Sequence, residues 1–418
     1  MRTIITEPGA SGAGESGEPI PSLELFDSPR AWRMVAAAFV AMFATYGVAY
    51  SFGAFFKPMA VEFGTRRSAT SAVFSITVLV WCILGPVTGH LADRFGPRIV
   101  VATGAIGMGL GLALTSIIDR LWLGYLTYGL GVGVGVACAY VPMVAVVGGW
   151  LIRRRNTGLG IAVAGIGFGT VCGAPIAAAL IAHLGWRTTY LVFAIATTAI
   201  LLGCAWIVER PPVHVTPSRV RLADALRSPA FGFLYASSVT VSIVIFVPFV
   251  YLPSFAHDRG ASEFASAALV GIIGGASVAG RMGLGSLADR AGVVRLYQAS
   301  FFVLALSYGI WLAAASYPMM IVFALVMGVG YGGYVALSPA VIAHLFGTQR
   351  MGTVLGALYT SGGIGAMVGP PLVGLIIDRT GSYRVAIAAA FAVALASFAL
   401  LIPLRRYERP GELPIESD

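Results

Sequence analysis

Apolar runs of about 20 residues recur along most of the chain, and this recurrence constrains its fold more than any other feature. Each run is long enough to cross the ~30 Å hydrocarbon core of a bilayer as an α-helix. The runs are about twice as long as membrane-barrel strands and do not alternate apolar with polar residues, which excludes a barrel. The sequence therefore predicts an all-α membrane protein with twelve transmembrane helices, beginning near residues 31, 68, 98, 121, 157, 187, 230, 264, 295, 318, 352 and 384.

The composition excludes the common soluble classes. Of the 418 residues, 58% are hydrophobic and only 11% are charged, whereas a soluble domain carries about 25% charged residues. A chain with so few charges cannot cover a surface that faces water, so a soluble enzyme, a nucleic-acid-binding protein and a disordered protein are all excluded. The net charge of +9 is then better explained by basic loops on one side of a membrane than by nucleic-acid binding.

The distribution of basic residues predicts the orientation. If both termini are cytoplasmic, 18 of the 27 lysines and arginines fall on the inner side and 8 on the outer side, with Arg281 inside a span. Inner loops are enriched in basic residues, so we expect cytoplasmic termini and a multi-pass protein of the inner (plasma) membrane. The first 30 residues contain no apolar stretch, which argues against a cleaved signal peptide and for a flexible tail.

The chain repeats itself at an offset of 196 residues, which predicts two six-helix halves with the substrate path between them. The matching segments are 89–96 and 285–292, 150–154 and 346–350, and 173–175 and 369–371. The predicted organisation is a cytoplasmic tail over 1–30, a first bundle over 31–207, a polar cytoplasmic linker over 208–229, a second bundle over 230–404 and a cytoplasmic tail over 405–418.

Twelve spans, the repeat and a Gly-x-Leu-Ala-Asp-Arg-x-Gly loop in each half resemble the major facilitator superfamily over residues 31 to 404. In that family the loop helps to close the cytoplasmic side. The resemblance implies gating roles for Gly89, Asp93 and Arg94 in the first half and for their counterparts Gly285, Asp289 and Arg290 in the second. Tight turns with basic flanks are the alternative interpretation of these loops.

Arg281 is the ionisable residue that falls inside a predicted span, because the 18 acids and five histidines lie in tails, loops or span ends. An arginine at the centre of the hydrocarbon costs at least roughly 2.5–3.5 kcal/mol, so we expect it to face a cavity and to be neutralised there. With no carboxylate in the spans, the expected partner is a substrate carboxylate, which suits the planar fork of a guanidinium. The alternative is an arginine that reaches the inner headgroups and pairs with Asp289.

The sequence around Arg281 is similar to that of monocarboxylate transporters and of the oxalate/formate antiporter, in which an arginine four residues before a glycine binds the substrate carboxylate. Segments 46–57, 140–150 and 331–339 are also similar to these carriers, including the aromatic cage of the antiporter. The resemblance implies that Arg281 binds substrate together with the residues Tyr50, Tyr140, Tyr331, Tyr359 and Ser277.

Two departures from these relatives bear on substrate charge and on proton coupling. Gly362 stands where the dianion antiporter has a second intramembrane lysine, so one cation predicts one substrate carboxylate. Ser277 and Tyr50 stand where animal monocarboxylate transporters have an aspartate and a lysine. Proton symport and anion exchange therefore both remain open.

These features predict a secondary carrier of small organic anions, monocarboxylates of the lactate and pyruvate type. Alternatives are an oxalate/formate-type exchanger, a drug or sugar exporter of the same superfamily, and a receptor that uses the fold without transport. No nucleophile with its base and no metal-ligand cluster is evident, so the sequence predicts no enzyme, no cofactor and no metal site. The expected partners are a small carboxylate and the bilayer, with a monomer as the functional unit.

Overall fold

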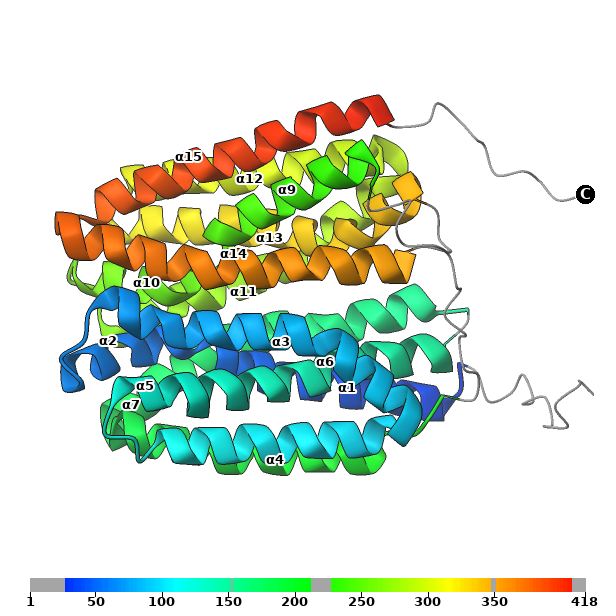
Figure 1. Ribbon diagram of the computed structural model, residues 1–418, viewed down its shortest axis with the longest axis horizontal. Helices are drawn as coiled ribbons and strands as arrows, with labels where there is room; N and C mark the ends of the chain where they lie inside the picture. Colours follow the sequence, from blue (N-terminus) through cyan, green and yellow to red (C-terminus); the bar gives the residue numbers. More distant parts are fainter. Residues whose placement is uncertain (1–26, 152, 212–226, 347–350, 408–418) are drawn as a thin grey trace, which may run out of the picture.

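The computed structural model describes residues 27–151, 153–211, 227–346 and 351–407, and most of these form helices that run along the long axis of the molecule (Figure 1). Eleven helical segments are long and apolar enough to cross a membrane. One of them, α7 (Arg155–Ile207), changes direction at Gly185, whose φ of 77° is not helical. Counted as two, α7 brings the described segments to the twelve crossings that the sequence predicts.

The helices form two halves, one above the other in Figure 1. The start of α1 and the end of α15 lie at one end of the molecule, which we call the terminus end; the opposite end is the far end. The first half contains α1 (Pro29–Tyr50), α2 (Phe52–Glu62), α3 (Arg67–Phe95), α4 (Pro97–Thr115), α5 (Leu121–Gly124), η2 (Tyr125–Leu130), α6 (Gly131–Trp150) and α7. The second half contains α9 (Pro229–Ile245), α10 (Val247–His257), α11 (Glu263–Ala291), α12 (Val293–Ala313), α13 (Tyr317–Phe346), α14 (Met351–Thr380), α15 (Tyr383–Leu401) and η4 (Ile402–Tyr407).

The backbone reproduces the repeat of the sequence. Six glycines among the described residues have a positive φ, a conformation that residues with a Cβ rarely adopt. All six fall into pairs 196 residues apart, so the sharp turns between helices occur at equivalent places in the two halves. The pairs are Gly64 (φ 59°) with Gly260 (89°), Gly96 (95°) with Gly292 (85°), and Gly185 (77°) with Gly381 (66°).

The two halves also begin in the same way. Ser28 and Ser228 each precede a proline at the first position of a helix, and their hydroxyls accept hydrogen bonds from the backbone N–H groups of Ala31 and Phe231. Serine is a favoured N-cap and proline a favoured first residue, because the proline lacks an N–H that would be unpaired there. The predicted tails and linker fall largely on residues 1–26, 212–226 and 408–418, which lie outside the described residues.

Candidate functional site

A cavity of about 370 Å³ lies between the two halves and is lined by residues from both. Arg281 on α11 is the one charged residue among the described residues that line it. The other lining side chains are mainly aromatic and aliphatic. They include Tyr46, Tyr50, Trp81, Tyr140, Val141, Val144 and Ile166 from the first half and Ile245, Phe246, Tyr331, Tyr334, Val335, Leu355 and Tyr359 from the second.

The guanidinium of Arg281 is only partly satisfied by the protein. Its Nη1 donates a hydrogen bond of 3.0 Å to the carbonyl oxygen of Val163 on α7. Its Nε and Nη2 are buried and have no hydrogen-bond partner among the described residues. These two nitrogens lie on the edge of the guanidinium that pairs with a carboxylate through two parallel hydrogen bonds. Unpaired buried donors are costly, so this edge favours an anionic partner.

Four tyrosines that the sequence predicts as substrate contacts lie around the same cavity and are joined in pairs across the two halves. The hydroxyls of Tyr50 and Tyr331 share a hydrogen bond of 3.0 Å. Those of Tyr140 and Tyr359 share another of 3.0 Å. The guanidinium carbon of Arg281 lies 5.9 Å from the centre of the Tyr331 ring. The structure therefore brings one cation and four phenols together from segments up to 309 residues apart.

Ser277 is not brought to this cavity. Its side chain is buried, and its hydroxyl donates to the carbonyl oxygen of Gly274 on the same helix at 2.8 Å. The backbone of α11 at Ser277 packs closely against Gly332 of α13. Tyr46, Trp81 and Phe246 line the cavity although they are not among the residues that the sequence predicts as substrate contacts. Their aromatic character was the available signal, but aromatic residues in spans are common packing residues.

The loop motifs predicted to gate the molecule lie at the terminus end. A Cβ on Gly89 would approach Val141 of α6 to 3.0 Å, so this glycine permits close packing of α3 and α6. Asp93 and Arg94 are exposed at the end of α3, and the backbone carbonyl of Arg94 accepts a hydrogen bond from Arg210. The counterparts Gly285, Asp289 and Arg290 lie on α11, with side chains outside the described set. Gating by these residues stays a prediction.

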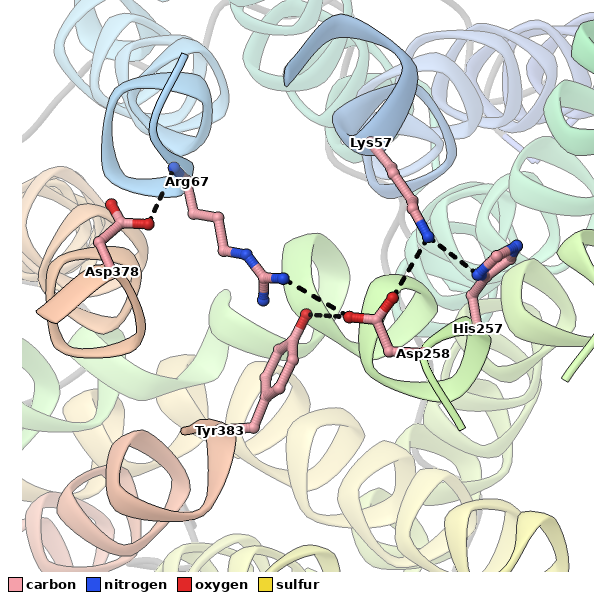
Figure 2. Close-up of polar contacts among 6 residues, drawn as sticks. All are labelled: Lys57, Arg67, His257, Asp258, Asp378 and Tyr383. Atoms are coloured by element: carbon pink, nitrogen blue, oxygen red, sulfur yellow. Dashed lines mark hydrogen bonds and ion pairs between the residues drawn. The ribbon is translucent and has the colours of Figure 1, made fainter. Parts of the chain in front are cut away.

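A polar network joins the two halves at the far end, and the sequence does not predict it. We call its six residues the latch: Lys57, Arg67, His257, Asp258, Asp378 and Tyr383 (Figure 2). Asp258 of the second half is its centre. One carboxylate oxygen lies 3.2 Å from Lys57 Nζ, and the other lies 3.5 Å from Arg67 Nη2 and accepts from the Tyr383 hydroxyl at 3.1 Å. Lys57 also lies 3.0 Å from His257 Nδ1.

Asp378 extends the latch by capping a helix of the other half. Its carboxylate accepts hydrogen bonds from the backbone N–H groups of Arg67 and Ser68, at the start of α3, and from the Ser68 hydroxyl. A carboxylate at a helix N-terminus is favourable because it meets unpaired N–H groups and the positive end of the helix dipole.

Between the latch and the cavity, the two halves pack closely enough to close the far end of the cavity. The rings of Tyr50 and Phe249 are stacked with their centres 4.4 Å apart. A Cβ on Gly53 would collide with the carbonyl oxygen of Phe249, so α2 and α10 approach each other there at a distance that only glycine permits. Among the described residues, the side-chain hydrogen bonds between the halves occur in the latch, beside it at Tyr251, and around the cavity.

Comparisons with protein-family models and with known proteins indicate the same family. A model of the Major Facilitator Superfamily matches residues 34–311 and 276–417. Monocarboxylate transporter 12-B of Danio rerio is 27% identical over 393 residues, covering 84% of this chain and 82% of that protein. Monocarboxylate transporter 13 of Rattus norvegicus is 27% identical over 405 residues, covering 92% and 93%.

Among solved structures, a bacterial homologue of the human lysosomal transporter Spinster, described in an inward-facing and occupied conformation, gives a TM-score of 0.78. The alignment covers 93% of this chain and 100% of that one at 14% sequence identity. At this identity the likeness bears on the fold alone.

Proposed function

Because this chain belongs to the major facilitator superfamily and is therefore a membrane transporter, we propose that it carries organic anions with one carboxylate group. The proposal rests on the Nε and Nη2 atoms of Arg281, which are buried without a hydrogen-bond partner among the described residues. The cavity beside them has no other charged residue in its described lining. A carboxylate supplies both the missing hydrogen bonds and the missing countercharge. The monocarboxylate transporters among its relatives support the same substrate class.

The cavity also separates this proposal from the other transport functions. No aspartate, glutamate, asparagine or glutamine is found among the described lining residues. A cationic drug would therefore lack a countercharge there, and a sugar would lack the amides that bind its hydroxyls. Gly362, which lines the cavity, supplies no second cation for a dianion such as oxalate.

We further propose that the termini are cytoplasmic, in an inner (plasma) membrane, so that the far end is external. In the sequence, the segments assigned to the cytoplasmic side carry 18 basic residues and those assigned to the outer side carry 8. In this orientation the latch and the stacked rings of Tyr50 and Phe249 close the external side, so we expect the cavity to open toward the cytoplasm. Transport then requires the latch to open while the terminus end closes, as the two halves rock about the substrate.

Substitution of Arg281 tests the proposal. Arg281→Lys keeps the charge but loses the two-pronged geometry, and Arg281→Gln loses both. We expect uptake of labelled pyruvate into liposomes to fall at least about tenfold in the lysine variant, a loss of about 1.4 kcal/mol, and to background in the glutamine variant. Arg295→Gln, an exposed arginine on α12, is the matched control and should retain uptake. Normal uptake by Arg281→Gln at equal protein incorporation would remove Arg281 from the mechanism.

A further inference from the structure

The cavity wall is dominated by aromatic rings. Eight aromatic side chains line it, and they come from both halves: Tyr46, Tyr50, Trp81, Tyr140, Phe246, Tyr331, Tyr334 and Tyr359. Tyr359 is 41% exposed although it lies inside the molecule, which indicates that its ring faces the open space of the cavity.

Six of these rings form one connected surface. The centre of the Trp81 ring lies 5.7 Å from that of Tyr46 and 6.3 Å from those of Tyr50 and Phe246. Tyr46 is 6.0 Å from Tyr140, whose ring is in turn 6.3 Å from Tyr359. Faces and edges of aromatic rings attract a further ring at such separations. A flat aromatic ligand would therefore find partners on several sides.

The polar groups of the wall are few and largely paired with one another. The hydroxyls of Tyr50 and Tyr331 are hydrogen-bonded together, and so are those of Tyr140 and Tyr359. Each pair leaves one hydroxyl hydrogen for a ligand, since the other is used within the pair. Apart from the carboxylate position at Arg281, this wall suits an apolar ligand surface better than one rich in hydroxyl groups.

The volume of the cavity also favours a ligand that is larger than a three-carbon acid. Its volume of about 370 Å³ lies in the range of about 300–1,000 Å³ typical of sites for drug-sized ligands. One water molecule occupies about 30 Å³ in the liquid, so the cavity has room for roughly a dozen. A three-carbon acid such as lactate or pyruvate would leave most of this space as water against aromatic walls.

We propose that the preferred substrate is an aryl monocarboxylate, an acid with a single carboxylate on a short chain that ends in an aromatic ring. The carboxylate pairs with the Nε–Nη2 edge of Arg281, and the ring lies among Trp81, Tyr140 and Phe246. This inference rests on the proposed function, because it uses the same arginine as the anchor. It narrows the substrate from lactate and pyruvate to their phenyl-bearing analogues.

Matched ligands isolate the contribution of the ring. Pyruvate with phenylpyruvate, and lactate with 3-phenyllactate, differ by a phenyl group alone, and 3-phenylpropanamide carries the ring without the charge. Binding to the purified full-length protein is measured by titration calorimetry. We expect each phenyl acid to bind at least about tenfold more tightly than its short partner, and the amide to bind more weakly than 3-phenylpropanoate.

A variant that fills the cavity locates the ring. Gly356 lines the cavity, and a Cβ on it would meet no atom within 4 Å, so Gly356→Phe adds a ring to the open space. We expect this variant to lose the preference for the phenyl acids over their short partners, because the added ring occupies the space of the phenyl group. Gly203→Phe, at an exposed position of α7 that is likewise free of neighbours within 4 Å, is the control and should keep the preference.

The outcomes separate this inference from the proposed function. If pyruvate and lactate bind as tightly as their phenyl analogues and Arg281→Gln abolishes binding, the aryl preference is wrong and the monocarboxylate function stands. If Arg281→Gln leaves the binding of every acid unchanged, both fail. If the wild type prefers the phenyl acids and Gly356→Phe does not reduce that preference, the ring does not lie in this cavity and the inference is overturned.

Discussion

Gly362 lines the cavity at a position where a charged side chain would add a second cation to Arg281. It lines the cavity on α14, and a Cβ at this position would lie 3.6 Å from the Sγ of Cys82, an ordinary contact. A side chain can therefore be added here without displacing the backbone, which distinguishes it from Gly363, where the approach to Cys82 is 3.1 Å. With Arg281 alone, one charge of a dianion has no countercharge among the described lining residues, which is unfavourable for binding.

Gly362→Lys should make dianions better substrates. The added ammonium supplies the second countercharge, so we expect oxalate at pH 7 to compete with labelled pyruvate at least about tenfold more effectively than in the wild type, a change of about 1.4 kcal/mol. Gly362→Met, which is similar in length and uncharged, is the control for bulk. An unchanged ratio of oxalate to pyruvate competition in the lysine variant would show that charge count does not set selectivity.

The latch joins helix ends of the two halves, and its contacts are weak enough to break during transport. The side chains of Lys57, Arg67 and Asp258 are 47%, 35% and 31% exposed, and ion pairs this accessible to water contribute about 0–1 kcal/mol each. The cap that Asp378 places on α3 adds about 0.5–2 kcal/mol. The total of a few kcal/mol is enough to favour the closed far end and small enough to leave an open minor state populated.

Asp258→Asn should shift the population toward an open far end. The substitution preserves size but weakens the contacts to Lys57 and Arg67, and a loss of about 1 kcal/mol changes the ratio of states about fivefold. Spin labels at Arg120 and Arg379, exposed positions on opposite halves, should show a larger fraction of long distances. The background has its four cysteines replaced, so that labels attach only at these sites.

Glu62→Gln is the matched control for this experiment. Glu62 forms an ion pair of 2.6 Å with Arg187 at the same end of the molecule, but both residues belong to the first half. Breaking this pair should leave the distance distribution unchanged. Equal shifts in the two variants would mean that the far end responds to any lost charge and that the latch has no specific role.

At the scale of the whole molecule, the two halves enclose a cavity in which no carboxylate is found among the described lining residues. An arginine side chain is not deprotonated in proteins. With no carboxylate in the described lining to carry a proton, we expect movement of an anion in one direction to be balanced by movement of another in the opposite direction.

Anion exchange should therefore proceed without a pH gradient. Liposomes loaded with unlabelled substrate should take up labelled substrate at equal internal and external pH, and empty liposomes should take up much less. Accumulation driven by a pH gradient in the absence of exchange would demonstrate a protonation site in the protein. If that accumulation also persists in His90→Ala and Asp93→Asn variants, the site does not lie at these span ends.

The sequence by itself determined the crossings, the repeat and the presence of a cation inside a span. The length of an apolar run depends only on consecutive residues, so the bilayer imposes the helices wherever the runs occur. The turns at Gly96 and Gly292 are equally local, because a positive φ depends on the absence of a Cβ. Arg281 was identifiable because a charge within an apolar run requires a partner.

Only the tertiary structure decided which residues meet. Lys57 and Asp258 are 201 residues apart, and in the sequence they are simply charges near span ends. Whether a residue on a helix faces a cavity or a neighbouring helix depends on how that helix is rotated and packed. Arg281 therefore lines the cavity, whereas Ser277, four residues earlier on the same helix, is buried outside the cavity lining with its hydroxyl bonded to Gly274. The aromatic wall and the latch arise from the same long-range packing, which no local pattern specifies.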